Sequence, residues 1–119
     1  MDHKSKFIFE NNVTPEQMEF YNEHGFIHYK NFFTAEQIAD ALKAVETLQS
    51  EWISQDLEKV NGIPIKYGKD ENGKKIIQRF AFASLYSEYL HELLKDKRLD
   101  KLRYFIGEDA RIAENEKDG

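Results

Sequence analysis

Four histidines are the side chains in this 119-residue sequence best suited to hold a metal ion or to move a proton at neutral pH. His24 lies in the last turn of an expected helix, where an imidazole interacts favourably with the terminal carbonyl groups. His28 lies within an expected strand and is the histidine best placed to line a pocket. The other two are His3, near the N-terminus, and His91, on an expected helix. For each of them a structural role in a solvated or half-buried position is favoured over metal ligation.

The other motifs that could carry chemistry are incomplete. The segment DENG suggests a calcium loop, but placing Gly73 at the sixth loop position puts Gly68 and Arg79 at the first and twelfth, where carboxylates are required. The glycines form no GxGxxG or P-loop motif, and no serine stands in a glycine-flanked elbow. The sequence contains no cysteine, which excludes a disulfide, a zinc knuckle and a thiol nucleophile.

Two nearly identical phrases, TPEQ and TAEQ, indicate where two helices begin. In each, the threonine side chain can accept a hydrogen bond from the backbone N–H three residues later, while the glutamine reaches back to the threonine N–H. These capping boxes pair Thr14 with Gln17 and Thr34 with Gln37. The first helix is expected to stop at Gly25, and the aromatic and β-branched residues 26–31 are expected to form a strand.

A stripe and a hairpin follow the second capping box. Along the second helix, apolar residues recur at a spacing of three and four and predict one face that packs on a core: Ile38, Leu42, Val45, Leu48 and Trp52. The Asn72-Gly73 pair predicts a tight turn between strands at 63–67 and 75–82. Because Pro64 cannot donate to a ladder, the first of these strands is expected at a sheet edge.

Two further helices and a final strand complete the expected order of elements. Ser84 or Ser87 opens a third helix, Asp96 caps a fourth that closes at Gly107, and a strand begins near Ala110. The chain therefore predicts part of one α+β, mostly helical domain, organised as a flexible lead-in at 1–13, helix–strand–helix at 14–60, a hairpin at 61–83, a helix pair at 84–107 and the start of a core strand at 108–119.

Charge and hydropathy narrow the classes of partner. The formal net charge is −5, and basic residues are interspersed with acids, so no face is expected to neutralise nucleic-acid phosphates. No apolar run approaches the roughly 18 residues that span a bilayer. The N-terminus MDHKSKFIFE also lacks the apolar core of a signal peptide. The sequence thus predicts a cytoplasmic protein without nucleic-acid or membrane partners.

The opening TPEQMEFYNEHGFIHYKNFFTAEQI, followed by a long amphipathic helix, resembles the N-terminal part of the phytanoyl-CoA dioxygenase family of iron(II)- and 2-oxoglutarate-dependent oxygenases. The resemblance continues from KKIIQRFAFASLY to the C-terminus and covers nearly the whole chain. It implies that the capped helices, the hairpin and the helix pair buttress a double-stranded β-helix, or jelly roll. It further implies that the complete enzyme hydroxylates a small-molecule substrate with iron(II) and 2-oxoglutarate.

The catalytic core of such an enzyme is not expected within these 119 residues. The family's metal ligands begin with His-x-Asp or His-x-Glu, whereas the residues two positions after the four histidines are Ser5, Phe26, Lys30 and Leu93. A jelly roll also needs about eight strands, and this sequence offers about three. We therefore expect an N-terminal part with ligands downstream of Gly119, which alone binds neither iron(II) nor 2-oxoglutarate and is inactive.

Two polar side chains are candidates for lining the cofactor or substrate pocket of the complete enzyme. The resemblance implies that the strands at 75–82 and from Ala110 run beside this pocket, which singles out Gln78 and Asn115. A solvent-facing position remains open for both. In this interpretation, apolar helix faces left uncovered favour self-association. The alternative function is a free-standing, non-enzymatic helical module in which the stripe that includes Trp52 binds a partner protein.

Overall fold

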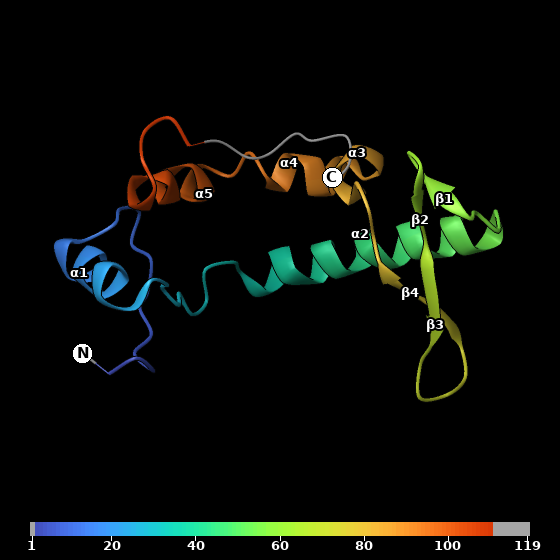
Figure 1. The fold of residues 1–119 in the computed structure, drawn as a ribbon, viewed down its shortest axis with the longest axis horizontal. Coiled ribbons are helices and arrows are strands. Elements are labelled where there is room, and N and C mark those ends of the chain that lie inside the picture. Colours follow the sequence, from blue (N-terminus) through green and yellow to red (C-terminus); the bar gives the residue numbers. More distant parts are fainter. Residues whose placement is uncertain (1, 111–119) are drawn as a thin grey trace. The chain divides into compact units, whose positions relative to one another are not determined.

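The computed structural model describes residues 2–110 (Figure 1). The described elements combine helices with two small antiparallel sheets, which confirms the predicted α+β class. In chain order they are α1 (Pro15–His24), α2 (Ala35–Ser54), β1 (Lys59–Val60), β2 (Ile63–Pro64), β3 (Lys66–Lys69), β4 (Lys75–Arg79), α3 (Ala83–Tyr86), α4 (Glu88–Leu93), α5 (Lys97–Lys101) and a 3-10 helix at Leu102–Phe105. Residues 111–119, where the last strand was predicted, lie outside this description.

The chain forms two compact units. Unit 1 combines the described residues up to Ala35 with those from Leu94 onward, and unit 2 comprises Glu36–Leu93. Unit 1 is therefore built from both ends of the described chain, while unit 2 is continuous there.

In unit 1, the predicted capping box starts α1. The Thr14 side chain accepts a hydrogen bond from the Gln17 N–H, and the Gln17 side chain accepts one from the Thr14 N–H, both at 3.2 Å. Gly25 ends the helix in the left-handed conformation, with a φ of 78°, and donates its N–H to the Tyr21 carbonyl at 2.7 Å. Both ends of this helix are confirmed, because both depend on residues close in sequence.

The strand predicted at 26–31 does not form. A single parallel bridge joins Tyr29 to Phe7, with the Phe7 N–H donating to the His28 carbonyl at 2.9 Å. Asn31 then adopts a positive φ of 54°, which takes the chain out of the extended conformation. Residues 26–31 have strand composition, but a strand needs a pairing partner along its whole length. The lead-in offers a partner at Phe7 alone, which pairs with Tyr29.

Aromatic rings form the interior of unit 1. Phe20 is fully buried and contacts the rings of Phe7 and Phe26 edge-on, with centroid separations of 5.3 and 5.6 Å. Phe9 packs in the same way on Tyr29, also at 5.3 Å. Two rings of the lead-in, which the sequence predicts to be flexible, are therefore packed against the rest of this unit.

The apolar stripe of α2 packs on a core over only part of its length. Its C-terminal half supplies Leu48 and Trp52 to the buried core of unit 2, which also contains Val60, Ile77 and Phe82. In its N-terminal half, by contrast, two residues of the predicted stripe are exposed: Ile38 by 55% and Leu42 by 58%.

Two consecutive hairpins replace the single hairpin predicted between 63–67 and 75–82. Asn61 and Gly62 both have positive φ, 48° and 80°, and connect Val60 to its antiparallel partner Ile63. Positive φ at both central residues is the signature of the two-residue type I′ turn. The first predicted strand is therefore divided between β2 and β3, which belong to different sheets.

In the second hairpin, β3–β4, the tight turn predicted at Asn72-Gly73 is a three-residue loop. Asp70 donates its N–H to the Lys74 carbonyl at 2.9 Å, and its own carbonyl accepts from the Gly73 N–H at 3.0 Å. The Asp70 carboxylate also accepts from the N–H groups of Asn72 and Lys74, at 2.8 and 2.9 Å. Of the predicted pair, Gly73 alone has a positive φ, 79°, as expected for a type I turn followed by a left-handed residue.

The predicted third helix is two short helices, α3 and α4, separated at Ser87. The Ser87 hydroxyl accepts a hydrogen bond from the Leu90 N–H at 3.3 Å and so caps α4. Asp96 caps α5 as predicted, accepting from the Arg98 N–H at 2.8 Å. The remainder of the predicted fourth helix continues as the 3-10 helix.

Candidate functional site

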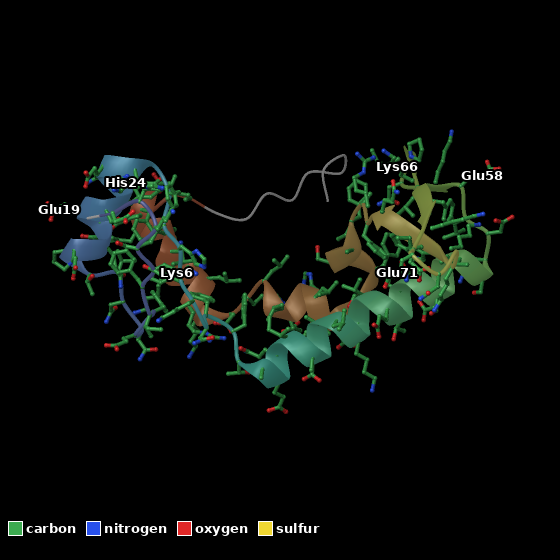
Figure 2. All side chains as sticks on the ribbon, turned by 90° about the horizontal axis from the view of Figure 1, so that it is seen from below. Lys6, Glu19, His24, Glu58, Lys66 and Glu71 are labelled. Carbon is green, nitrogen blue, oxygen red and sulfur yellow. The ribbon has the colours of Figure 1, made fainter. Side chains whose placement is uncertain are left out.

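The four histidines occupy separate positions in the described structure. His24 lies at the end of α1 (Figure 2). It is half-buried, and the centroid of its ring is 4.4 Å from that of Phe20. The other three, His3, His28 and His91, are exposed. Among residues 2–110, no group of three or more His, Cys, Asp or Glu side chains is arranged to hold a metal ion.

The residues described here do not fit an iron(II) site. A 2-His-1-carboxylate site needs three ligands on one face with open positions beside them, and neither the sequence motif nor a suitable cluster occurs in the described part of the chain. No catalytic step can therefore be assigned to these side chains.

Gln78, the first predicted pocket residue, is the extra residue of a β-bulge in β4. The register passes from the pair Lys66 and Arg79 directly to the pair Tyr67 and Ile77, which leaves Gln78 without an opposite residue. Its exposed side chain lies over Gly68, where an added Cβ atom would meet the Gln78 Nε2 at 2.4 Å. The second predicted residue, Asn115, lies outside the described residues.

The described surface of unit 2 carries a groove. It lies between α2 and the α3–α4 junction, has a volume of about 350 Å³, and is open to solvent. Its lining combines carboxylates, hydroxyls, one ammonium group and apolar atoms, supplied by Asp40, Lys43, Ala44, Thr47, Leu48, Glu51, Tyr86, Ser87 and Tyr89. Gln78 is not among these lining residues.

Hydrogen bonds within unit 2 position the two tyrosines of the groove. The Tyr86 hydroxyl donates to the Asn61 side-chain oxygen at 2.8 Å, and the Tyr89 hydroxyl donates to the Gln37 carbonyl at 3.0 Å. Burial and the negative charges of Asp40 and Glu36 raise the pKa of Tyr89. At neutral pH the groove therefore presents aromatic rings beside carboxylates. Both phenolic hydroxyls already donate hydrogen bonds within unit 2, to Asn61 and to Gln37.

No pattern in the sequence predicts this groove. Its walls come from segments more than thirty residues apart, and Tyr86 and Tyr89 form no recognisable motif with α2. The local signal that existed was the capping residue Ser87, which sets where the chain turns between α3 and α4. A long-range contact, such as the hydrogen bond between Tyr89 and Gln37, produces no residue spacing that can be recognised in the sequence.

No family model, curated protein or solved structure matches this chain. Of the helices described, none combines the length and apolar character needed to cross a membrane.

Proposed function

We propose that this chain is the N-terminal part of an iron(II)- and 2-oxoglutarate-dependent oxygenase of the phytanoyl-CoA dioxygenase type. In this proposal it buttresses a jelly-roll core that supplies the metal ligands and binds 2-oxoglutarate and a small-molecule substrate. The support is the resemblance of residues 14–38, in which a capped helix, a glycine, an aromatic segment and a long amphipathic helix follow one another. A cytoplasmic location remains part of the proposal.

One structural observation carries the proposal: the apolar face of α2 continues beyond the elements that cover it. Gln49 marks the covered part, since its side-chain oxygen accepts a hydrogen bond from the Ile77 N–H of β4 at 2.8 Å. Leu42 and Ile38 lie seven and eleven residues earlier, which places them on the same helical face. Both are exposed by more than half. A sheet that extends the layer of β4 along α2 would cover them.

Hydrophobic burial gives this arrangement an energetic reason. Covering an isoleucine and a leucine that are now exposed would contribute up to about 1.5–3 kcal/mol each. The proposed jelly-roll core is an element of suitable kind, because one face of each of its sheets must pack on another layer. The proposed role of this chain is accordingly structural, and the chemistry is assigned to the core.

The first test reads the coding sequence that continues past the codon for Gly119. A His-x-Asp or His-x-Glu motif followed by a distal histidine supports the proposal, and an immediate stop codon contradicts it. The second test uses the present chain in an anaerobic iron(II) titration and a succinate assay. We expect neither tight iron binding nor succinate, and iron-dependent succinate formation would refute the assignment of the ligands to a missing core.

A pair of variants tests the structural role. Ile38→Glu and Leu42→Glu should change the stability of this chain little, because both positions are exposed. In the extended protein, each should lower the unfolding midpoint and the activity, since a charge would enter the interface with the core. Glu46→Gln on the same helix is the matched control. Equal effects in the short and extended proteins would contradict the proposed packing.

The second candidate is a free-standing helical module that binds a partner protein through the same exposed residues, Ile38 and Leu42. An amphipathic helix with an uncovered apolar face is a common surface for such binding. A stop codon after Gly119 together with a monodisperse, cooperatively unfolding monomer would favour this candidate over the oxygenase.

A further inference from the structure

Opposite charges gather on different elements of unit 2. Helices α2, α3 and α4 carry six carboxylates and a single lysine: Glu36, Asp40, Glu46, Glu51, Glu88 and Glu92, with Lys43. The β3–β4 hairpin carries the opposite excess, five cations against two carboxylates: Lys66, Lys69, Lys74, Lys75 and Arg79, with Asp70 and Glu71. The charges lie in blocks along the chain, acidic at 36–51 and 88–92 and basic at 66–79, and the fold brings the two acidic blocks together.

The groove between α2 and the α3–α4 junction lies within the acidic part. Its lining includes the carboxylates of Asp40 and Glu51, the single ammonium group of Lys43 and the half-exposed ring of Tyr86. The neighbouring Leu85 is exposed by 62%. Because the hydroxyls of Tyr86 and Tyr89 are engaged within the unit, the groove offers ring faces and carboxylates, which are the groups that attract an ammonium ion with an aliphatic stem.

The hairpin carries cations of this kind, and it already makes such a contact within its own strands. The Lys75 ammonium lies 4.1 Å from the centre of the Tyr67 ring. Three further lysines, Lys66, Lys69 and Lys74, are exposed. In Figure 1 the hairpin loop extends on the side of α2 away from α3 and α4, and no residue of the hairpin is among those that line the groove.

We propose that the groove of one copy of this chain receives the β3–β4 hairpin of a second copy. The occupant is a second copy because this chain itself carries the complementary charge, on a hairpin that contributes no residue to the lining of its own groove. The contact is heterologous, since different surfaces of the two copies meet, and it can therefore extend to further copies. This inference concerns unit 2 and goes beyond the proposed oxygenase function.

Salt dependence distinguishes this contact from apolar association. Contacts between exposed charges weaken as the screening length falls, from about 30 Å at 0.01 M salt to about 3 Å at 1 M. Light scattering at low salt should give a mass at least twice the 14.1 kDa of the monomer, and the mass should approach the monomer value at high salt. Association through Ile38 and Leu42 would instead persist at high salt.

Charge reversal provides the decisive experiment. A hairpin variant (Lys66→Glu, Lys69→Glu, Lys74→Glu) and a groove variant (Asp40→Lys, Glu51→Lys) should each be monomeric at low salt, because like charges then face each other. Mixing the two variants should restore association, since both contacts become complementary again. Glu19→Lys, in α1 of unit 1, is the control and should leave association unchanged. Trp52 fluorescence verifies that unit 2 remains folded in each variant.

Three results would overturn the inference. The first is a chain that stays monomeric at every salt concentration, even if the groove binds a short polylysine. The second is association that changes neither with salt nor with charge reversal. The third is failure of the two folded variants to associate when they are mixed. None of these results bears on the exposed face at Ile38 and Leu42 or on the coding sequence past Gly119, so the oxygenase proposal is tested separately.

Discussion

Gln17 shows how a single polar side chain is satisfied in the interior of unit 1. It is buried, and its side-chain oxygen accepts hydrogen bonds from the Thr14 N–H at 3.2 Å and from the Tyr29 hydroxyl at 2.7 Å. The helix cap and the aromatic packing therefore meet at one oxygen atom. Burial also raises the pKa of Tyr29 to about 12.

The raised pKa predicts a loss of stability at alkaline pH. Between pH 10, the ordinary pKa of the phenol, and about 12, the unfolded state has lost the Tyr29 proton while the folded state keeps it. Because the unfolded state binds fewer protons in this pH range, the free energy of unfolding falls as pH rises. The full contribution of Tyr29 to stability is therefore present only below pH 10. Tyr29→Phe should remove the highest-pH step from a tyrosinate absorbance titration. An unchanged titration would contradict the assignment.

The cap of α1 predicts a measurable cost for Thr14→Ala. The substitution removes the acceptor for the Gln17 N–H and should lower the free energy of unfolding by about 1 kcal/mol. Denaturant unfolding measures this difference. Thr47→Ala, inside α2, is the matched control and should be neutral or stabilising, because alanine favours helix interiors. Equal effects of the two substitutions would argue against a specific cap.

Local capping residues could be predicted from the sequence: Thr14 with its partner Gln17, Asp96, and Ser87 as one of two candidates with Ser84. Thr14 with Gln17, Asp96 with Arg98 and Ser87 with Leu90 are two or three residues apart, and their chemistry depends on that spacing alone. The bond from Tyr29 to Gln17 and the groove tyrosines join residues separated by a dozen positions or more. Their partners depend on the tertiary fold, so no short sequence motif predicts these contacts.

Among the elements, the β3–β4 loop depends on the left-handed conformation of one residue. Gly73 has a φ of 79°, and nothing lies within 4 Å of an added Cβ atom, so a substitution there acts through the backbone. Gly73→Val should reduce hydrogen-exchange protection in β3 and β4, because a β-branched residue resists positive φ. Gly73→Asn is the control, since asparagine tolerates this conformation better. Equal protection in both variants would exclude a requirement for positive φ.

Arg98 connects α5 to the turn that precedes α2. Its guanidinium donates to the Phe32 carbonyl and to both oxygens of Asp96, at 3.0 and 2.8 Å, and lies over the rings of Phe32 and Phe33 at 5.2 and 5.5 Å. The hydrogen bond to Asp96 raises the pKa of Arg98, so the cation persists across the accessible pH range.

Removing this cation should loosen α5 within unit 1. Arg98→Ala should lower the free energy of unfolding by about 1.5–3 kcal/mol, the range for hydrogen bonds to charged groups. Trypsin cleavage at Lys97 and Lys101 should accelerate. Arg103→Ala is the matched control, because the Arg103 ion pair with Asp100 is exposed and should contribute less than about 1 kcal/mol. Cleavage at the same rate in both variants would contradict this role.

Helix starts were easier to predict than strands for a physical reason. α1, α2, α4 and α5 begin where a capping residue stands, since a helix satisfies its hydrogen bonds within itself. A strand satisfies them with another segment, so residues 26–31 could have strand composition and still form one bridge. The Asn72-Gly73 pair illustrates the same limit, because only Gly73 has a positive φ there, whereas both residues of Asn61-Gly62 have one.

For the whole molecule, the two units have interiors of different kinds. Unit 1 is built around Phe20 and neighbouring rings, and unit 2 around the aliphatic and aromatic cluster that contains Leu48 and Trp52. The sequence shows neither the discontinuity of unit 1 nor the contact between the two acidic helices of unit 2, α2 and α4. Both depend on which segments meet in the fold, and the sequence offers only local periodicity and composition.

Separate interiors predict separate responses to mutation. Phe20→Ala removes a fully buried ring and should destabilise unit 1 by about 3–5 kcal/mol, and Leu48→Ala should destabilise unit 2 by about 2–5 kcal/mol. Trp52, the only tryptophan, lies in the core of unit 2 and reports its unfolding by fluorescence. Hydrogen exchange at the Phe7 amide, which donates to the His28 carbonyl, reports on unit 1.

We expect Phe20→Ala to accelerate exchange at Phe7 while leaving the Trp52 unfolding midpoint unchanged, and Leu48→Ala to do the reverse. The physical reason is that substitutions without shared partners have additive effects. The double variant should then show both changes, each as large as in its single variant. A common shift of both probes by either single substitution would show that the chain unfolds as one cooperative body, despite its two clusters of contacts.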